Sequence, residues 1–290
     1  DVYKRQIVKE TVEIEFLSNL DSFYLDLTSV NTESLGMKLN PTFGVQEGSK
    51  PISYNHVSDQ LWIKPGNAQK SDTRTFTLEF SGTPQNGLII GKNKFEDRTF
   101  FGDNWPNRAH NWFACVDHPS DKAIVNFTVN APNHYNCIAT GIKTRESKGK
   151  GKTTIHQFQS EHELPTKVMV VGLAEFSIKN IEHQPPFPFE HSSWVYPQDS
   201  TVGHAQTQVA NDVLEFFISK IGEYPFEKLA TVQSTTMFGG MENAGNIFYD
   251  ENAFGEGKNM EALIAHEIAH QWFGNSASES DWPHLWLSEG

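Results

Sequence analysis

Residues 262–275 read ALIAHEIAHQWFGN and place two histidines four positions apart, with a glutamate directly after the first. Residues four apart on an α-helix lie one turn above each other on the same face, so His266 and His270 can present their imidazoles to one metal ion. Glu267 lies about 100° further round the helix axis, where it can act on a molecule beside the ion. The pattern therefore predicts a helix with a metal-binding face.

The same stretch also carries a packing face and the signals of a helix end. Ile264 and Ile268 belong to an apolar stripe that would anchor the helix to a core. Asn259 is a candidate N-cap, and Gly274 is a candidate residue just beyond the C-terminus. These signals predict a helix within residues 257–275.

A catalytic zinc site needs three protein ligands and one open position. Glu289 follows His270 after eighteen intervening residues and can supply the third ligand. Zinc would lower the pKa of a water molecule in the open position, and Glu267 could accept its proton. A short match of this kind also arises by chance in helices. The prediction of zinc ligands His266, His270 and Glu289, with Glu267 as general base, therefore needs further support.

The bulk properties exclude several classes of protein. The chain has 290 residues, 37% of them hydrophobic, and a formal net charge of -13. Such an acidic protein is a poor candidate for binding nucleic acid through its phosphates. The sequence contains no apolar run of about 18 to 20 residues, which a membrane-spanning helix requires. The two cysteines do not form a disulfide framework, so the compartment stays open.

The first two thirds of the chain have the pattern of an antiparallel β domain. Apolar and polar residues alternate in short segments that are separated by Gly, Pro, Asn and Asp. These segments are VKETVEIEF (8–16), SFYLDLTSV (22–30), TRTFTLEF (73–80), AIVNFTVN (123–130), HYNCIATGI (134–142) and TTIHQFQS (153–160). A segment with four prolines, residues 183–199, follows them.

Helical spacing begins after the proline-rich segment, within residues 203–226, and a strand candidate, LATVQSTTMF, covers residues 229–238. This change predicts an α+β chain with two domains. Residues 1–198 would form the β domain, and residues 199–290 would begin a catalytic domain.

The strand candidate is followed directly by GGMEN, Gly239 to Asn243. A G-x-M-E-N motif upstream of H-E-x-x-H, eighteen residues and a glutamate resembles the gluzincin family of zinc aminopeptidases, which includes aminopeptidase N and the leukotriene epoxide hydrolase. NWFACVDHPSDKA (111–123) is similar to a segment of that family's N-terminal domain. The resemblance extends from about Val8 to Gly290. It implies a saddle-like β domain followed by the start of a thermolysin-like α/β zinc-peptidase domain.

The physical interpretation of GGMEN agrees with this resemblance. An exopeptidase must recognise a free α-ammonium group, and the carboxylate of Glu242 can pair with it. Gly239 and Gly240 let an extended peptide approach the backbone, and Met241 and Asn243 complete the substrate-binding segment. Taken alone, GGMEN could equally be a glycine-rich strand end with an exposed acid.

The family's second anchor for the substrate amine maps onto Asp103, in FFGDNWPN, although the local sequence departs from the family pattern. Asp103 could equally be a turn residue. Asn275 and Asp281 are candidates for orienting the metal ligands, and both are also ordinary cap residues.

The resemblance also implies parts that the printed sequence lacks. The family's transition-state stabiliser is a tyrosine well downstream of the glutamate ligand, and a helical domain follows it. Tyr249 is not at the matching position. The first six residues, DVYKRQ, look like a cloning scar. We therefore expect the chain to be an N-terminal fragment. We also expect the fragment to be poorly active alone, since losing one oxyanion donor costs about 10²–10³ in rate.

The leading hypothesis is a zinc aminopeptidase with one Zn²⁺ per chain that acts on peptides with a free N-terminus. The alternatives are a bifunctional aminopeptidase and epoxide hydrolase, a zinc endopeptidase, and a non-catalytic peptide-binding relative. A weak cue for the bifunctional enzyme is Gly240, where many members of the family have alanine. The preferred N-terminal residue and the oligomeric state stay open.

Overall fold

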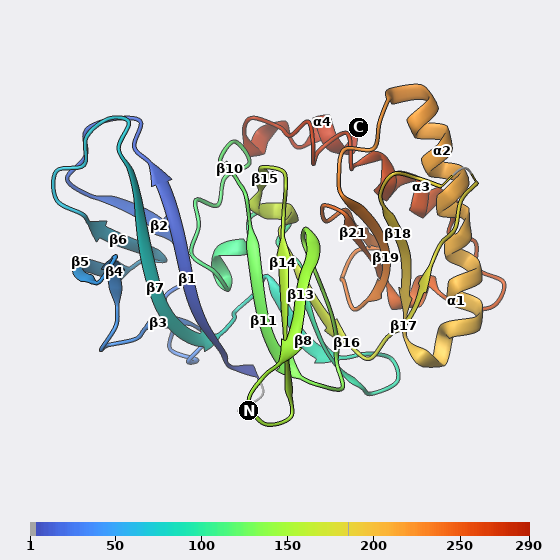
Figure 1. Ribbon diagram of the computed structural model, residues 1–290, viewed down its shortest axis with the longest axis horizontal. Helices are drawn as coiled ribbons and strands as arrows, with labels where there is room; N and C mark the ends of the chain where they lie inside the picture. Colours follow the sequence, from blue (N-terminus) through green and yellow to red (C-terminus); the bar gives the residue numbers. More distant parts are fainter. Residues whose placement is uncertain (1–3, 185) are drawn as a thin grey trace. The chain divides into compact units, whose positions relative to one another are not determined.

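The computed structural model describes residues 4–184 and 186–290. The chain divides into two compact units, each with its own internal contacts. One unit contains the residues up to Leu88 together with Asn107–Asp117, and the other contains Ile89–Pro106 together with His118–Gly290. Figure 1 colours their strands and helices along the sequence.

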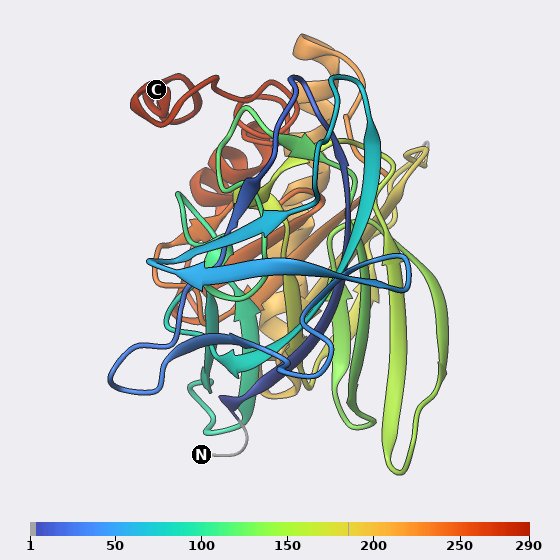
Figure 2. The same cartoon turned by 90° about the vertical axis from the view of Figure 1, so that its left-hand side faces the viewer.

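The first unit is built on one seven-stranded antiparallel sheet. Along the sheet the strands are β1 (Gln6–Glu15), β7 (Thr73–Thr83), β4 (Val45–Glu47), β5 (Lys50–Val57), β6 (Gln60–Lys64) and β2 (Phe23–Asp26), with β3 (Gly36–Leu39) also paired to β7. The long strands β1 and β7 run side by side and curve together (Figures 1 and 2). Phe76, Leu78 and Phe80 alternate along β7 and are buried, so the alternation in the sequence predicted the buried face of the sheet.

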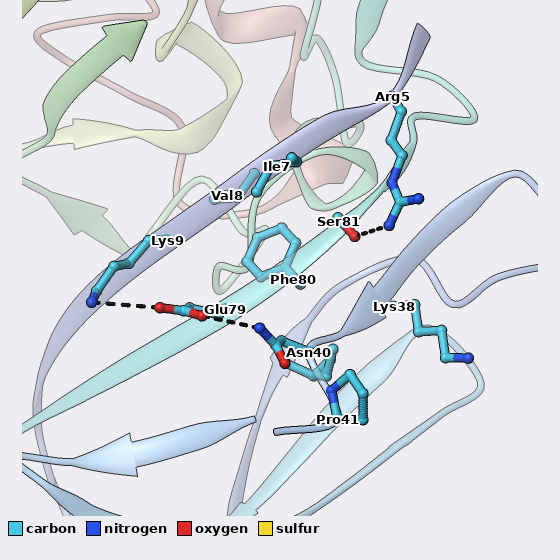
Figure 3. Close-up of a pocket in the computed structure, with 11 residues that line it drawn as sticks. Arg5, Ile7, Val8, Lys9, Lys38, Asn40, Pro41, Glu79, Phe80 and Ser81 are labelled. Atoms are coloured by element: carbon cyan, nitrogen blue, oxygen red, sulfur yellow. Dashed lines mark hydrogen bonds and ion pairs between the residues drawn. The ribbon is translucent and has the colours of Figure 1, made fainter. Parts of the chain in front are cut away.

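A groove of about 650 Å³ is lined by residues of β1 and β7 and of the chain around the end of β3 (Figure 3). Its polar side chains contact one another: Lys9 Nζ lies 3.5 Å from Glu79 Oε1, and Arg5 donates to the hydroxyl of Ser81 at 2.7 Å. None of the predicted zinc or substrate residues is among the residues that line it. The groove is therefore not a candidate for the predicted chemistry.

The second unit contains several small sheets. Their strand orders are β10 (Lys122–Ala123) and β15 (Leu164–Pro165); β11 (Asn126–Pro132), β14 (Thr153–Gln159) and β13 (Ile142–Lys148); β12 (Asn136–Ala139), β16 (Val171–Ala174), β9 (Arg98–Gly102) and β8 (Leu88–Lys92); and β17 (Ser177–Asn180), β18 (Glu190–Val195), β19 (Lys228–Ser234), β21 (Asn246–Asp250) and β20 (Gly240–Met241). The first two sheets are antiparallel, and so are the pairs β12–β16 and β16–β9 of the third. In the fourth sheet, β18, β19 and β21 are parallel, whereas β17 and β20 are antiparallel to their neighbours.

One aromatic-rich core joins two of these sheets. The rings of Phe101 (β9) and Phe248 (β21) meet edge to face with their centroids 5.3 Å apart. Ile138 from β12 and Val232 from β19 belong to the same buried cluster. The strand β21, which pairs with the GGMEN strand β20, is therefore fixed from its buried side.

The α-helices of the described ranges lie in the last third of the chain: α1 (Ser200–Gln206), α2 (Ala210–Ile221), α3 (Glu261–Ala269) and α4 (Trp286–Glu289). The predicted fold class, mostly antiparallel β followed by the first elements of an α/β region, is confirmed. The five-stranded sheet draws strands from both sides of residue 198, and the domain boundary there stays a prediction. No helix in the described ranges is long and apolar enough to cross a membrane.

A partly buried acid in β1, Glu10, makes the stability of the first unit depend on pH. Glu10 accepts a hydrogen bond from the backbone N–H of Ala114 at 2.9 Å, and burial raises its pKa from 4.5 to about 8. The folded state then holds a proton that the unfolded state has lost. The stabilisation from that proton is complete below pH 4.5 and is lost as the pH rises through 8.

We therefore expect Glu10→Gln to stabilise the protein at about pH 9 by on the order of 2 kcal/mol, and much less at about pH 5, because the amide cannot ionise and can still accept the bond. Urea unfolding at the two pH values measures the difference. Glu13→Gln, exposed on the same strand, is the matched control. An equal effect of Glu10→Gln at both pH values would contradict the prediction.

Candidate metal centre

Three predicted ligands converge in the structure. The imidazole Nε2 atoms of His266 and His270 lie 3.1 Å apart, and Glu289 Oε2 lies 3.8 Å and 3.6 Å from them. A point equidistant from three atoms with these separations lies about 2 Å from each, and zinc bonds to nitrogen and oxygen are about 2.0–2.2 Å long. Two neutral imidazoles and one carboxylate are also a donor set that zinc accepts. The residues therefore fit a zinc ion.

His270 is the more firmly held of the two histidines. Its side chain is buried, whereas that of His266 is half exposed. His270 Nδ1 donates to the carbonyl oxygen of Phe273 at 3.1 Å, which leaves the lone pair of Nε2 for a metal ion. The end of α3 thus sets the tautomer and the orientation of this ligand.

Glu289 reaches the histidines because the chain turns back after α3. Gly274 has a φ of +113°, as the predicted position beyond the helix end requires. A Cβ on Gly274 would lie 2.9 Å from the Cβ of Ser288, so the missing side chain lets α4 approach α3 closely. Asp281 caps the short helix η7 (Trp282–His284) by accepting from the N–H of Trp282 at 2.8 Å.

Glu267 lies beside the metal ligands and is buried against the GGMEN strand. A Cβ on Gly240 would lie only 2.3 Å from Glu267 Oε1, so glycine at that position leaves the space that this carboxylate occupies. Burial, together with the nearby charges of Glu242 and Glu289, raises the pKa of Glu267 to about 9. A bound cation would act in the opposite direction.

The GGMEN turn is attached to the end of the metal-binding helix. The carbonyl oxygen of Glu242 accepts hydrogen bonds from Gln271 Nε2 at 2.9 Å and from Asn275 Nδ2 at 2.6 Å. Gln271 Oε1 accepts in turn from the N–H of Gly245 at 3.0 Å. Sequence reasoning missed Gln271, although this polar residue stands directly after His270. It predicted Asn275 as a partner of the metal ligands, whereas the hydrogen bond of its side-chain amide goes to the turn.

The side chain of Glu242 is buried and its Oε1 has no hydrogen-bond partner among the residues that the structure describes. Burial raises its pKa to about 7, and the positive charge of Lys167 opposes this rise. A buried carboxylate oxygen without a partner is a receptor for a cationic group.

Three of the other predicted substrate-binding residues are buried. Met241 is part of the buried core, and Asn243 is fully buried. Asp103 is buried directly after β9, and its anchor role stays a prediction. A cavity of about 260 Å³ opens at the metal ligands and is lined by His266, Ala269, His270, Phe273, Leu287, Ser288, Glu289 and Gly290.

Comparison with known proteins gives matches along most of the chain. The model of the Peptidase M1 N-terminal domain matches residues 4–168, and that of the Peptidase family M1 domain matches residues 204–290. Aminopeptidase N of Oryctolagus cuniculus is 30% identical over 194 residues, which are 61% of this chain and 20% of that protein. Leucine aminopeptidase 2 of Saccharomyces cerevisiae is 26% identical over 282 residues, which are 94% of this chain and 38% of that protein.

Solved structures show the same fold. The M1 zinc metallopeptidase from Deinococcus radiodurans superposes with a TM-score of 0.75 at 19% identity, covering 98% of this chain and 63% of that one. A mutant of that enzyme bound to a Tyr-Ser-Ala substrate gives a TM-score of 0.77 at 20% identity, covering 98% and 64%. The chain therefore spans less than two thirds of the length of these relatives.

The geometry predicts that zinc binding depends on the exposed ligands. We expect zinc to raise the thermal unfolding temperature of the wild type, because an ion that binds only the folded state adds about 2.7 kcal/mol at 100 times its dissociation constant. In Glu289→Ala and His266→Ala this rise should be lost. His284→Ala changes an exposed histidine of the neighbouring η7 and should keep it. An undiminished rise in Glu289→Ala would exclude this residue as a ligand.

Proposed function

The chain belongs to peptidase family M1, and from this membership we propose that it forms the zinc-binding part of an aminopeptidase that releases N-terminal residues from peptides. The observation that carries the proposal is that the end of α3 holds two groups of residues: the proposed zinc ligands and Glu242, the proposed binder of the substrate amine. His266 and His270 face Glu289 on one side, and Gln271 and Asn275 hold the backbone of Glu242 on the other. The names of the relatives, which are aminopeptidases, support this assignment.

His266, His270 and Glu289 would hold one zinc ion. Bound zinc supplies Lewis acidity, which polarises a peptide carbonyl and brings the pKa of a water molecule toward neutrality. The separations of the three donor atoms support this role. The half-exposed side chain of His266 and the adjoining cavity leave room for a water molecule and a substrate carbonyl.

Glu267 would act as general base and then as general acid. Its carboxylate accepts the proton of the attacking water while a new C–O bond forms at the peptide carbonyl. The same carboxyl then delivers that proton to the leaving nitrogen as the C–N bond breaks. Burial between α3 and β20 supports this role, because it keeps bulk water from competing for the proton.

Glu242 would bind the α-ammonium group of the substrate and thereby select the end of the peptide. Its buried oxygen without a hydrogen-bond partner among the described residues fits a cation, and the fixed GGMEN turn fixes its position relative to the zinc ligands. The space beside Gly239 is open, since a Cβ there would meet only Leu263, at 3.5 Å, although the carbonyl oxygen of Gly239 already accepts from the N–H of Asp250 at 3.0 Å. A peptide could therefore lie against the chain at Gly239, three residues before Glu242.

We expect Glu267→Gln, in the complete reading frame, to lower kcat on aminoacyl reporter substrates by at least about 10²-fold, because the amide cannot accept a proton. Zinc content should stay at one ion per chain. Glu261→Gln, exposed in the first turn of the same helix, is the matched control and should keep wild-type kcat. Unchanged hydrolysis by Glu267→Gln would rule out the assigned base.

We expect Glu242→Gln to raise KM for substrates with a free amine by about 10- to 100-fold, the effect of losing a charge-assisted contact of about 1.5–3 kcal/mol. The wild-type KM should also rise as the pH falls through about 7, since Glu242 is then protonated and neutral, whereas the variant should lack this rise. Glu256→Gln, at an exposed position, is the control. Cleavage of N-acetylated peptides at the wild-type rate for free peptides would favour the endopeptidase alternative.

A further inference from the structure

A buried ion pair lies close to the proposed site without belonging to it. Lys167 Nζ donates to Glu279 Oε1 at 2.6 Å, and both side chains are 0% exposed. The two residues are 112 positions apart. Lys167 stands at the end of the segment matched as the N-terminal domain, and Glu279 stands in the segment matched as the peptidase domain. The proposed chemistry uses neither residue.

The lysine belongs to a firmly held element. It lies in the short helix η3 (Thr166–Val168). Asn104 Nδ2 donates to the carbonyl oxygens of Thr166 at 2.9 Å and Met169 at 2.6 Å, so the backbone of η3 is fixed from both sides. The carbonyl oxygen of Val168 accepts from the N–H of Ala244 at 3.2 Å. The element that carries Lys167 therefore also contacts the chain directly after GGMEN.

The glutamate belongs to the connection between the zinc ligands. Residues 275–281 lead from the end of α3 to η7 and so determine where Glu289 lies. At the start of this connection Asn275 donates to the carbonyl of Glu242, and near its end Glu279 accepts from Lys167. The ion pair thus closes a ring of contacts that runs through η3, the GGMEN turn and the connection.

Two exposed contacts hold the same connection more weakly. Lys122 Nζ donates to the carbonyl oxygen of Ser276 at 2.9 Å, and His118 Nε2 lies 3.3 Å from Asp281 Oδ1. Water competes with exposed pairs of this kind, which contribute little to stability. Backbone bonds tie Ser276 to Gln271 and Ala277 to Trp272, so they hold the connection to the chain just before it. The buried pair instead holds the connection to η3.

A buried ion pair is a poor device for stability alone. Removing two charges from water costs as much as their attraction returns, and apolar residues of similar volume often replace such a pair without loss. The pair instead fixes the relative position of the two segments, because a charged hydrogen bond of 2.6 Å forms in only one arrangement of Lys167 and Glu279. The positive charge of Lys167 also favours the anionic form of Glu242.

We propose that Lys167 and Glu279 are positioning residues for peptide hydrolysis: their buried ion pair fixes residues 275–281 against η3 and so holds Glu289 at the zinc site and the carboxylate of Glu242 at its distance from the metal. This inference rests on the proposed function. It predicts that, without the pair, Glu289 and the carboxylate of Glu242 are no longer held at fixed positions relative to the metal, even when the fold is kept.

The test replaces both charges in the complete reading frame. Lys167→Met with Glu279→Leu leaves no unpaired buried charge, so the variant should unfold near the wild-type temperature. Its zinc affinity, measured by competition with a chelator, should fall about 10- to 100-fold, and kcat/KM on aminoacyl reporters should fall by a similar factor. KM for free-amine substrates should rise together with the loss in zinc affinity.

The matched control is the ion pair between Lys94 and Asp199, which has the same 2.6 Å separation and lies between segments that carry none of the proposed site residues. Lys94→Met with Asp199→Leu should change neither zinc affinity nor kinetics. A folded Lys167→Met, Glu279→Leu variant with wild-type zinc affinity and wild-type kcat/KM overturns the proposal.

If that variant does not fold, Glu279→Gln provides the test. Its amide oxygen can still accept a hydrogen bond from Lys167, but the negative charge of Glu279 is lost. A measurable loss of zinc affinity supports the proposal, and unchanged zinc affinity with unchanged kcat/KM overturns it. A wild type that binds zinc but hydrolyses no free-amine reporter contradicts the proposed function instead. In that case the zinc affinities of the variants and the wild type can still be compared, and this comparison still tests the role of the ion pair.

Discussion

The carbonyl oxygen of Glu242 accepts hydrogen bonds from two side chains, Gln271 and Asn275, that follow His270, the second of the two proposed histidine ligands. The distance between Glu242 and the histidines at the end of α3 depends on these two hydrogen bonds, which form a junction between the GGMEN turn and the helix. The junction joins a strand end, whose backbone could recognise a peptide, to a helix end, whose side chains could hold a metal ion. The partners are buried amides, so the bonds are protected from water and keep a constant length.

The core behind this junction explains why it can be rigid. β20 pairs with β21, and β21 packs through Phe248 onto Phe101 of another sheet. The apolar stripe of α3 is buried at Ile264 and Ile268, so the face proposed to bind the metal differs from the packing face of the helix. Sites that are built on strands and helices packed in this way keep their geometry better than sites on loops.

Local patterns in the sequence predicted the elements that carry the site. The spacing of His266 and His270 predicted a helix, and the alternation around Phe76 and Phe80 predicted a strand with one buried face. The helix predicted within 257–275 is shorter in the structure, Glu261–Ala269, and the N–H groups of Asn275, Ser276 and Ala277 bond to carbonyl oxygens five positions earlier instead of four.

Contacts between distant residues could not be predicted in the same way. Lys167 and Glu279 are 112 positions apart, and each looks like an ordinary surface charge in the sequence, since burial is decided by the folding of the segments around them. The junction at Glu242 was missed for a related reason. A backbone carbonyl carries no residue-specific signal, so the sequence does not indicate which side chains bind it.

The close approach of Glu267 to Gly240 has a consequence for how this chain can vary. The carboxylate occupies the volume that a Cβ at position 240 would need, so the residue type at 240 and the rotamer at 267 are not independent. A chain that acquires a side chain at 240 must also move its carboxylate to another rotamer and repack the space that it leaves. The residue at position 240, in a strand, and the residue at position 267, in a helix, therefore constrain each other. A designer who grafts this site onto another scaffold has to transfer both residues together.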